Sequence, residues 1–390
     1  MGDGKEEGEK RLMEYYFRTE GMSVGYQGKP LIENIEIRLK RGEILTLIGP
    51  NGSGKSTILK SIAKELALIA GVVLLDKKSM ERMSGKEISR KMAVVFTEKL
   101  RAEMMTCEEV VATGRHPYTG HFGILSDQDR AVIREAMELV HVTEMRNRDF
   151  SKISDGQRQR VMLARAICQE PEIIVLDEPT SFLDVKYKLE FLSVLQELRS
   201  KKGLTVVMSL HELELAERVS DRILCVNQRH VERFGKPEEI FSPGYIKSLF
   251  GIETGSFDEE NGSIELEARK EKPEIFVIAG GGSGRRTYRR LQRERKAFFT
   301  GILYENDLDF PSARALASET VAARAFEPVE KSVLEQAKRV LDSCSTVICC
   351  RKNFGSMESA NRELLSYAEQ RGKKIEYTDG AYMQKVCREV

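Results

Sequence analysis

Apolar and polar positions along the chain follow two spacings in turn, one typical of strands and one typical of helices. Apolar runs at 44–48, 173–176 and 204–210 are strand-sized, and helix-like segments lie between such runs. From Glu20 to about Gly251 this alternation is typical of an α/β domain with a largely parallel core. The pattern therefore predicts one large α/β domain in this part of the chain.

A second, smaller α/β unit is predicted after a polar stretch. Residues 253–272 are rich in Glu, Gly, Ser and Lys and contain the turn signal Asn261–Gly262, so we expect a linker that can form a short hairpin. Strand-like runs then occur at 274–279, 297–303, 320–326, 345–350 and 374–377, with helical patterns at 329–342 and 358–371. The predicted organisation is a lead-in at 1–19, a domain at 20–252, a linker at 253–272 and a C-terminal α/β domain at 273–390.

Length and composition limit the classes of protein to which this chain can belong. The chain has 390 residues, which is more than one core usually holds, and a formal net charge of +1. This charge argues against a dominant nucleic-acid surface or a polybasic membrane anchor. No apolar run reaches the roughly 18 residues of a membrane-spanning helix, and the charged first ten residues do not resemble a signal peptide. The seven cysteines lack metal spacing, so we expect reduced and mostly buried thiols.

A glycine-rich string follows the apolar strand at 44–48 and precedes a helix. It fits the pattern G-x-x-x-x-G-K-[ST], whose backbone N–H groups and helix N-terminus cradle phosphates. Lys55 would reach the β- and γ-phosphates, and Ser56 would ligate Mg²⁺. A glycine-rich turn without function is the alternative, which the complete string disfavours. The string consists of Gly49, Pro50, Asn51, Gly52, Ser53, Gly54, Lys55, Ser56 and Thr57.

Two adjacent acids, Asp177 and Glu178, end the apolar strand at 173–176. Carboxylates at the end of a buried strand are costly unless they do electrostatic work. Asp177 suits the holding of Mg²⁺, and Glu178 suits a general base that polarises the attacking water. Taken alone, the pair fits a strand-end turn equally well, but the upstream phosphate loop favours catalysis.

Residues 153–160 read Ile-Ser-Asp-Gly-Gln-Arg-Gln-Arg and resemble the signature of ABC-type ATPases, with Asp155 where a glycine is commoner. Residues 181–184 resemble the D-loop of that family. His211 resembles its switch histidine, and Tyr26 resembles the aromatic residue that stacks on adenine. Together with the phosphate loop and the acidic pair, these motifs occur in family order.

The resemblance implies a P-loop NTPase fold with a RecA-like core, a helical subdomain and an antiparallel β subdomain. It also implies an ATPase that acts as a head-to-tail homodimer with two ATP molecules at the interface. One subunit would supply Tyr26, the phosphate loop, Asp177, Glu178 and His211 to each site, and its partner would supply Ser154, Gly156 and Gln157. A serine and glycine at a helix N-terminus form an anion site, and its natural target is the partner's γ-phosphate.

Within the family, residues 108–118, which contain Gly-Arg-His-Pro-Tyr, resemble the ATPases of iron-siderophore, haem and cobalamin importers. This resemblance implies a subunit at the cytoplasmic face of the membrane that powers a separate permease supplied by a binding protein, with no nucleic-acid partner. One alternative is a soluble ABC-type ATPase that acts as a switch on ribosomes or nucleic acid. Another is a non-catalytic ATP-binding module.

One departure from the family concerns a glutamine that contacts Mg²⁺ and the attacking water. Thr97 stands at that position and Glu98 follows it, so the coupling of nucleotide to permease is in doubt. Nearby apolar residues either form a patch for the permease or fill the helical subdomain's own core. They are Met104, Met105, Tyr118 and Phe122.

The C-terminal domain begins with a strand that ends in Gly280–Gly284 and then a basic helix, which resembles the start of a Rossmann-like unit without a complete G-x-G-x-x-G. Its arginines at 285, 286, 289 and 290 suit an anionic ligand or a solvated helix face. Asn306, Asp307 and Asp309 follow the next strand and are expected to line a crevice. Sensing of cargo or a nucleotide, and a role in interaction or dimer stability, both stay open.

Overall fold

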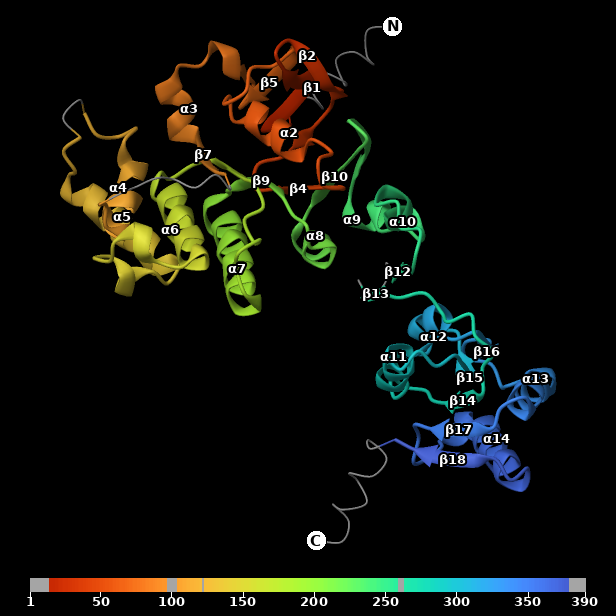
Figure 1. Cartoon of the computed structure of the whole chain (residues 1–390). Coiled ribbons are helices and arrows are strands. Elements are labelled where there is room, and N and C mark those ends of the chain that lie inside the picture. Colours follow the sequence, from red (N-terminus) through yellow and green to blue (C-terminus); the bar gives the residue numbers. More distant parts are fainter. Residues whose placement is uncertain (1–13, 97–103, 121–122, 259–262, 379–390) are drawn as a thin grey trace, which may run out of the picture. The chain divides into compact units, whose positions relative to one another are not determined.

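The computed structural model describes residues 14–96, 104–120, 123–258 and 263–378. The chain divides into two compact units, Met1–Phe250 and Gly251–Val390 (Figure 1). We refer to the first unit as the cassette and to the second as the C-terminal unit.

The cassette contains a six-stranded sheet in the order β11-β10-β4-β9-β8-β7. Neighbouring strands in it are parallel, except that β11 runs antiparallel to β10. Every residue of β4, β8 and β9 is buried, which explains why these strands appear in the sequence as continuous apolar runs. The strands are β4 (Ile44–Ile48), β7 (Met92–Val95), β8 (Ile173–Leu176), β9 (Thr205–Ser209), β10 (Arg222–Asn227) and β11 (His230–Gly235).

A second, antiparallel sheet packs against the phosphate-loop helix α2 (Lys55–Ile62). Its strands are β1 (Phe17–Tyr26), β2 (Lys29–Ile35), β3 (Arg38–Leu39), β5 (Ala70–Leu75) and β6 (Lys78–Ser79). Residues 27 and 28 join β1 to β2 in a two-residue turn, and both have positive φ angles of 52° and 73°. One apolar core joins this sheet, α2 and the larger sheet. The antiparallel β subdomain that the family resemblance implies is therefore present.

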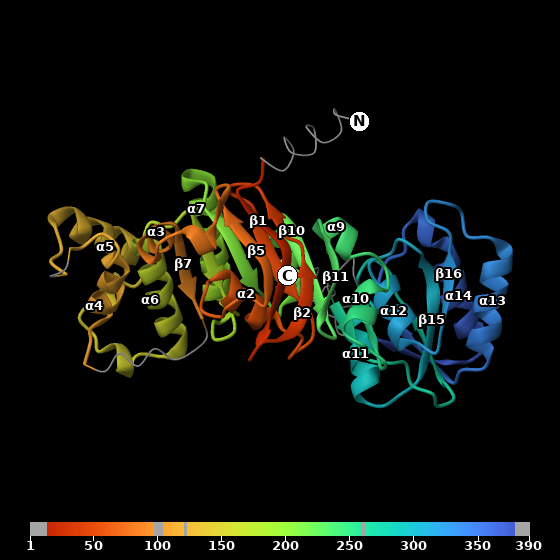
Figure 2. The same cartoon turned by 90° about the horizontal axis from the view of Figure 1, so that it is seen from above.

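The helical subdomain lies beside β7, at the end of the larger sheet opposite β10 and β11 (Figure 2). Its helices α4 (Cys107–Ala112) and α5 (Asp127–Leu139) both pack on α6 (Asp155–Cys168). Buried Arg115 ties them together, because its guanidinium donates to Asp129 Oδ1, Glu170 Oε2 and the carbonyl of Cys168, each at 2.8 Å.

The remaining cassette helices are α3 (Gly85–Lys91), α7 (Val185–Lys202), α8 (Leu213–Val219), α9 (Pro237–Ile240) and α10 (Tyr245–Leu249). Short 3₁₀ turns occur at Met80–Arg82, Thr113–Arg115, Thr143–Met145 and Phe150–Lys152.

The C-terminal unit is an open sheet of five parallel strands in the order β16-β15-β14-β17-β18. Two separate apolar cores lie against it. One contains residues of α11 and α12, and the other contains residues of α13 and α14, so helices cover both faces (Figure 1). This is the strand order of doubly wound folds, and the winding reverses between β14 and β17.

The elements of this unit agree closely with the sequence patterns. The strands are β14 (Ile275–Ile278), β15 (Phe298–Tyr304), β16 (Glu319–Ala323), β17 (Thr346–Cys349) and β18 (Lys374–Tyr377). The helices are α11 (Arg285–Arg293), α12 (Phe310–Leu316), α13 (Lys331–Asp342) and α14 (Ser359–Gln370), with a 3₁₀ turn at Ser356–Glu358. A hairpin of β12 (Ser256–Asp258) and β13 (Ser263–Glu265) precedes them.

One predicted boundary in this unit is wrong. The strand expected at 320–326 ends at Ala323, because the chain turns away and Phe326 has a φ of 62°, outside the strand region. The aromatic side chain of Phe326, which suggested a longer strand, is instead exposed.

Candidate functional site

The phosphate loop connects β4 to α2 at the carboxyl edge of the central sheet. Gly49 has a φ of 146°, and a Cβ atom there would lie 1.9 Å from the carbonyl oxygen of Val226 on β10. Gly54, at the N-cap of α2, has a φ of 107°. Both positions therefore require glycine, and the loop takes a shape that presents backbone N–H groups at the start of a helix.

The lysine of this loop is buried and bends back over it. Lys55 Nζ donates to the carbonyls of Gly49 at 2.8 Å and Pro50 at 3.0 Å. Burial lowers the pKa of Lys55, while the nearby charges of Glu178 and Asp177 act in the opposite direction. The structure thus brings the lysine and both predicted carboxylates together.

The other residues of the loop occupy distinct positions. Asn51 and Gly52 are exposed at its tip, and Ser53 Oγ is buried with no hydrogen-bond partner in the described part of the chain. The hydroxyl groups of Thr57 and Tyr26 lie 3.1 Å apart, which places the half-exposed Tyr26 ring beside the loop. Tyr26 and the loop therefore form one site.

The acidic pair is held from β9 by a serine that the sequence analysis missed. Ser209 Oγ donates to Asp177 Oδ1 at 2.7 Å and accepts from the backbone N–H of Glu178 at 2.9 Å. Glu178 has a φ of 48°, and its Oε1 lies 2.6 Å from Nε2 of His211. The only signal for Ser209 in the sequence is a hydroxyl at the end of an otherwise apolar strand, two residues before His211.

The signature residues form the first turn of α6. Ser154 is its N-cap and accepts from the N–H of Gln157 at 3.3 Å, while the Gln157 side chain accepts from the N–H of Ser154 at 3.1 Å. A Cβ atom on Gly156 would lie 3.0 Å from the carbonyl oxygen of Phe182 in the D-loop. The signature residues therefore contact their own helix and the D-loop of the same chain.

A magnesium ion fits the donors that the site offers. Mg²⁺ prefers oxygen ligands and usually takes one or two from protein, with phosphates and water supplying the rest. The Ser56 hydroxyl stands in the first turn of α2, and the Asp177 carboxylate is buried and oriented by Ser209. In the described ranges, no three His, Cys, Asp or Glu side chains gather to hold a metal alone. Phosphate oxygens are therefore needed to complete the coordination.

The structure bears on only some of the residues singled out near the helical subdomain. Thr97 and Glu98 lie outside the described residues, as does Phe122. Tyr118 belongs to the subdomain's own packing, because its hydroxyl donates to the carbonyl of Gln169 at 3.0 Å and its ring stacks on Arg115. Met104 is almost fully exposed.

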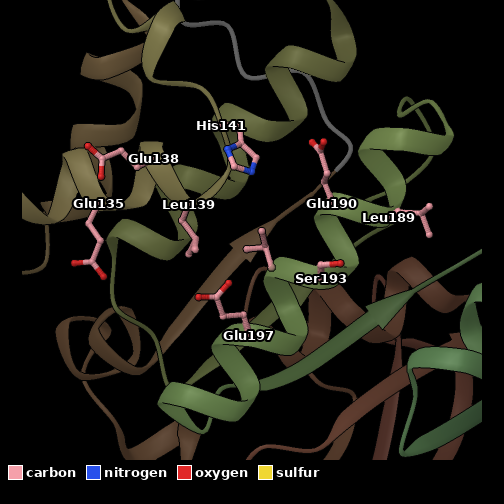
Figure 3. A pocket seen from close by; sticks show the side chains of 9 residues that line it. Glu135, Glu138, Leu139, His141, Leu189, Glu190, Ser193 and Glu197 are labelled. Carbon is pink, nitrogen blue, oxygen red and sulfur yellow. The ribbon is translucent and has the colours of Figure 1, made fainter.

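A pocket of about 580 Å³ lies between α5 and α7, and none of the predicted site residues lines it (Figure 3). Four glutamates, at 135, 138, 190 and 197, surround it. Three of them pair with lysines on α7, namely Glu135 with Lys202, Glu190 with Lys186 and Glu197 with Lys201. This pocket is separate from the phosphate loop.

In the C-terminal unit, the glycine loop after β14 is filled by a side chain of its own chain. Asp309 has 0% of its surface exposed and accepts from the backbone N–H groups of Gly280, Gly284 and Arg285 at 3.1, 2.8 and 3.1 Å. Burial raises the pKa of Asp309, although these hydrogen bonds oppose the shift. The expectation that Asp309 lines a crevice is therefore wrong.

A second carboxylate completes this arrangement. Asp307 accepts from the N–H of Gly281 at 2.9 Å and from the N–H of Asp309 at 2.8 Å. Because N–H groups of the loop already bind two carboxylates, the loop does not offer an open cradle for a phosphate.

A glycine loop, a buried lysine, an acidic pair and a signature helix on one mostly parallel sheet define a P-loop ATPase. Residues 32–181 match the model of the ABC transporter family. An ABC transporter ATP-binding protein of Methanocaldococcus jannaschii is 41% identical over 287 residues, covering 73% of this chain and 99% of the relative. The chain therefore belongs to the ABC transporter ATP-binding family, and the predicted ATPase activity and ABC cassette fold are confirmed.

Other relatives carry more specific names. The cobalamin import ATP-binding protein of Halobacterium salinarum is 30% identical over 335 residues, covering 84% of each chain. The iron(3+)-hydroxamate import ATP-binding protein of Bacillus subtilis is 37% identical over 235 residues, covering 60% of this chain and 87% of the relative. Residues 298–386 match the model of the MJ0874 family.

Solved structures of ABC transporter ATPases share the fold of the cassette. An inward-facing, metal-chelate type ABC transporter aligns with a TM-score of 0.54 and 25% identity, covering 64% of this chain and 95% of that one. A dimeric ATP-binding cassette bound to ADP and phosphate after hydrolysis aligns with a TM-score of 0.51 and 27% identity, covering 57% and 98%. Over the residues that the structure describes, no helix is both long and apolar enough to cross a membrane.

Proposed function

We propose that this ATPase powers the import of a metal chelate, either an iron-siderophore, haem or cobalamin, through a separate membrane permease. The contact between Glu178 and His211, next to the buried Lys55, carries the ATP-hydrolysing part of this proposal. The cargo class is supported by the names of the relatives and by the Gly-Arg-His-Pro-Tyr segment at 114–118. The permease would hold the subunit at the cytoplasmic face of the membrane, and a binding protein would deliver the cargo.

In the proposed site, the phosphate loop from Gly49 to Thr57 holds the triphosphate and Tyr26 stacks on adenine. The buried Ser53 hydroxyl, which lacks a partner among described residues, is then available to a phosphate oxygen. Ser56 and Asp177 would hold Mg²⁺, which when bound neutralises charge on the phosphates.

Hydrolysis depends on residues at the ends of β8 and β9. Glu178 accepts a proton from the attacking water, and His211 positions both that water and the γ-phosphate. Ser209 fixes the backbone of Glu178, so the carboxylate is oriented before ATP binds. Such prior orientation lowers the barrier because less rearrangement is needed in the transition state.

The proposed dimer supplies the other half of each site. Ser154, Gly156 and Gln157 of one subunit approach the γ-phosphate bound to its partner, with the N-terminus of α6 adding partial positive charge. Loss of the γ-phosphate removes the shared charge and lets the dimer open. We further propose the domain limits 20–252 and 273–390, with residues 253–272 as a linker.

Uptake of metal chelates by cells whose chromosomal gene for this chain has been deleted tests the proposal. Cells supplied separately with ⁵⁵Fe-siderophore, haem or cyanocobalamin should accumulate one of them when they carry the wild-type chain. A Glu178→Gln chain should not restore uptake. Equal uptake of all three by cells with and without the chain would contradict import.

A further inference from the structure

Four of the exposed apolar side chains of the C-terminal unit follow strand ends at one edge of its sheet. All five strands are parallel, so their carboxyl ends share that edge. Leu308 follows β15 and is 61% exposed, Phe326 follows β16 and is 86% exposed, and Met357 follows β17 and is 53% exposed. Tyr377, the last residue of β18, is 50% exposed. We call these four residues the apolar edge.

The size of this edge is set by the strands. Neighbouring strands lie about 4.8 Å apart, so the five strand ends span about 19 Å. Exposed apolar groups that gather on one side of a domain mark binding surfaces, whereas single ones are ordinary. Four such residues at the edge where doubly wound sheets bind ligands therefore indicate a broad ligand or partner.

Cationic side chains with spare hydrogen-bond donors accompany the apolar edge. Arg351 donates to the carbonyl of Gly280 at 2.9 Å and to Glu358 at 2.7 Å, but its Nε is buried with no partner in the described part. Arg285 donates from Nε to the carbonyl of Leu308 at 3.1 Å, while one of its terminal nitrogens, Nη2, is buried and likewise unpaired within those residues. Both side chains are only partly buried, so a ligand that brings oxygen acceptors can draw these donors out of their buried, unpaired positions.

The glycine loop at the same edge argues against a nucleotide as that ligand. A bound dinucleotide places its pyrophosphate on the N–H groups of such a loop. Here Asp309 and Asp307 accept from those groups, and Asp309 is fully buried. A phosphate would have to displace a buried carboxylate, so an apolar face with oxygens around its rim fits the edge better.

We propose that the carboxyl edge of the β14–β18 sheet binds an amphiphilic metal chelate of the class that the transporter carries. The apolar edge would contact the flat face of the chelate, and Arg285 and Arg351 would donate to carboxylate or amide oxygens on its rim. This inference rests on the proposed function, since it takes the ligand from the proposed cargo. It gives the C-terminal unit a binding role that is separate from ATP hydrolysis.

Equilibrium dialysis of the full-length chain without ATP tests the site, with haemin, cyanocobalamin and a ferric hydroxamate siderophore as probes. At least one probe should bind with a Kd below about 100 μM. The double substitution Leu308→Asp and Met357→Asp should weaken that binding about tenfold or more, because it places charge on the contact surface. Both side chains are exposed, so the variant is expected to fold.

Ile264→Asp is the matched control, because Ile264 is an exposed apolar residue of the same unit, on the β13 hairpin strand. Its binding should stay within about twofold of wild type. Equal weakening in both variants, displacement of the probe by NADH, or no binding of any of the three probes would overturn the inference. Uptake by cells that carry the wild-type chain is measured separately, so a chain that restores uptake of a chelate but binds none of the probes refutes the chelate site alone.

Discussion

Nε2 of His211 lies 2.6 Å from Oε1 of Glu178, so the two side chains that we assign to the attacking water are in direct contact. The contact joins the ends of two neighbouring parallel strands, β8 and β9. Glu178 is also fixed through its backbone, since its N–H donates to Ser209. The pair is therefore held by the sheet and not by a flexible loop alone.

Replacement of Glu178 by Gln should lower ATP turnover by about 10²- to 10⁴-fold, the usual loss when a general base is removed. ATP binding should persist, and the dimer should remain closed on ATP because the γ-phosphate stays in place. Phosphate release and size-exclusion chromatography with ATP measure the two effects. Glu214→Gln, which changes an exposed partner of Arg218, serves as the control. Wild-type turnover in the Glu178 variant would remove this residue from the base role.

Ser209→Ala should lower the free energy of unfolding by about 1–3 kcal/mol, because Asp177 and the N–H of Glu178 each lose a hydrogen-bond partner. Turnover should fall while the KM for ATP changes little, since Ser209 acts by positioning the acidic pair. Urea unfolding and steady-state kinetics check the two effects. Ser200→Ala, on the exposed side of α7, should change neither the free energy of unfolding nor turnover. An unchanged kcat in Ser209→Ala would show that its contacts are only structural.

Gly156→Ala should impair closure of the dimer without weakening ATP binding to a single subunit. The added Cβ would lie 3.0 Å from the carbonyl oxygen of Phe182 and must push the D-loop away. We expect a fall in turnover of about tenfold, equivalent to about 1.4 kcal/mol. Binding of a fluorescent ATP analogue measures the affinity of a single subunit for nucleotide. Phosphate release measures the turnover that depends on dimer closure. Gly85→Ala is the control, because a Cβ atom there meets nothing within 4 Å.

Asp309 should give the C-terminal unit a characteristic pH dependence. Burial raises the pKa of Asp309, so the folded state binds its proton more tightly than the unfolded state does. The stability that this group contributes is complete below its unfolded pKa and is lost as the pH rises through its folded pKa. Thermal unfolding between pH 4 and 7 should show this slope in the wild type and not in Asp309→Asn. Identical slopes in both chains would contradict the assignment.

The described cysteines should resist modification in the native protein. Burial raises the pKa of Cys168 and of Cys225 to about 12, and that of Cys350 to about 11. At pH 7.5 less than about one thiol in a thousand is then a thiolate, the form that reacts. A Cys387→Ser chain, which removes the cysteine outside the described residues, should react with a thiol reagent only after unfolding. Rapid reaction of two or more thiols in that chain would contradict the burial.

Contiguous motifs made much of the candidate site predictable. The phosphate loop and the acidic pair are each a single string, and the strands at 44–48 and 173–176 have the predicted bounds because each is a continuous buried run. Ser209 could not be found this way, because its contact with Asp177 depends on the register of β8 against β9, in which Leu176 lies opposite Met208. The cassette fold is thus predicted better than the side chains that orient its proposed catalytic residues.

Dependence on strand register also explains why the buried position of Asp309 could not be predicted from the sequence. Sequence patterns indicated polar residues after β15, but they could not show that the carboxylate turns inward under the glycine loop of β14. That arrangement depends on the parallel pairing of β14 with β15, which aligns Ile275 with Phe298. Contacts between strands that are separated along the chain are set by tertiary packing, and a local pattern does not contain that information.

The all-parallel order of the C-terminal sheet has a consequence for biosynthesis. Its central strand β14 pairs with β17, in which Thr346 lies opposite Ile275. This pairing can form only after β17 has been synthesised and has left the ribosome. Pairings that are remote along the chain form slowly, and domains tend to fold in order of synthesis. The cassette is therefore expected to be folded while the incomplete sheet of the C-terminal unit is still exposed. We expect the C-terminal unit, more than the cassette, to need chaperones during synthesis.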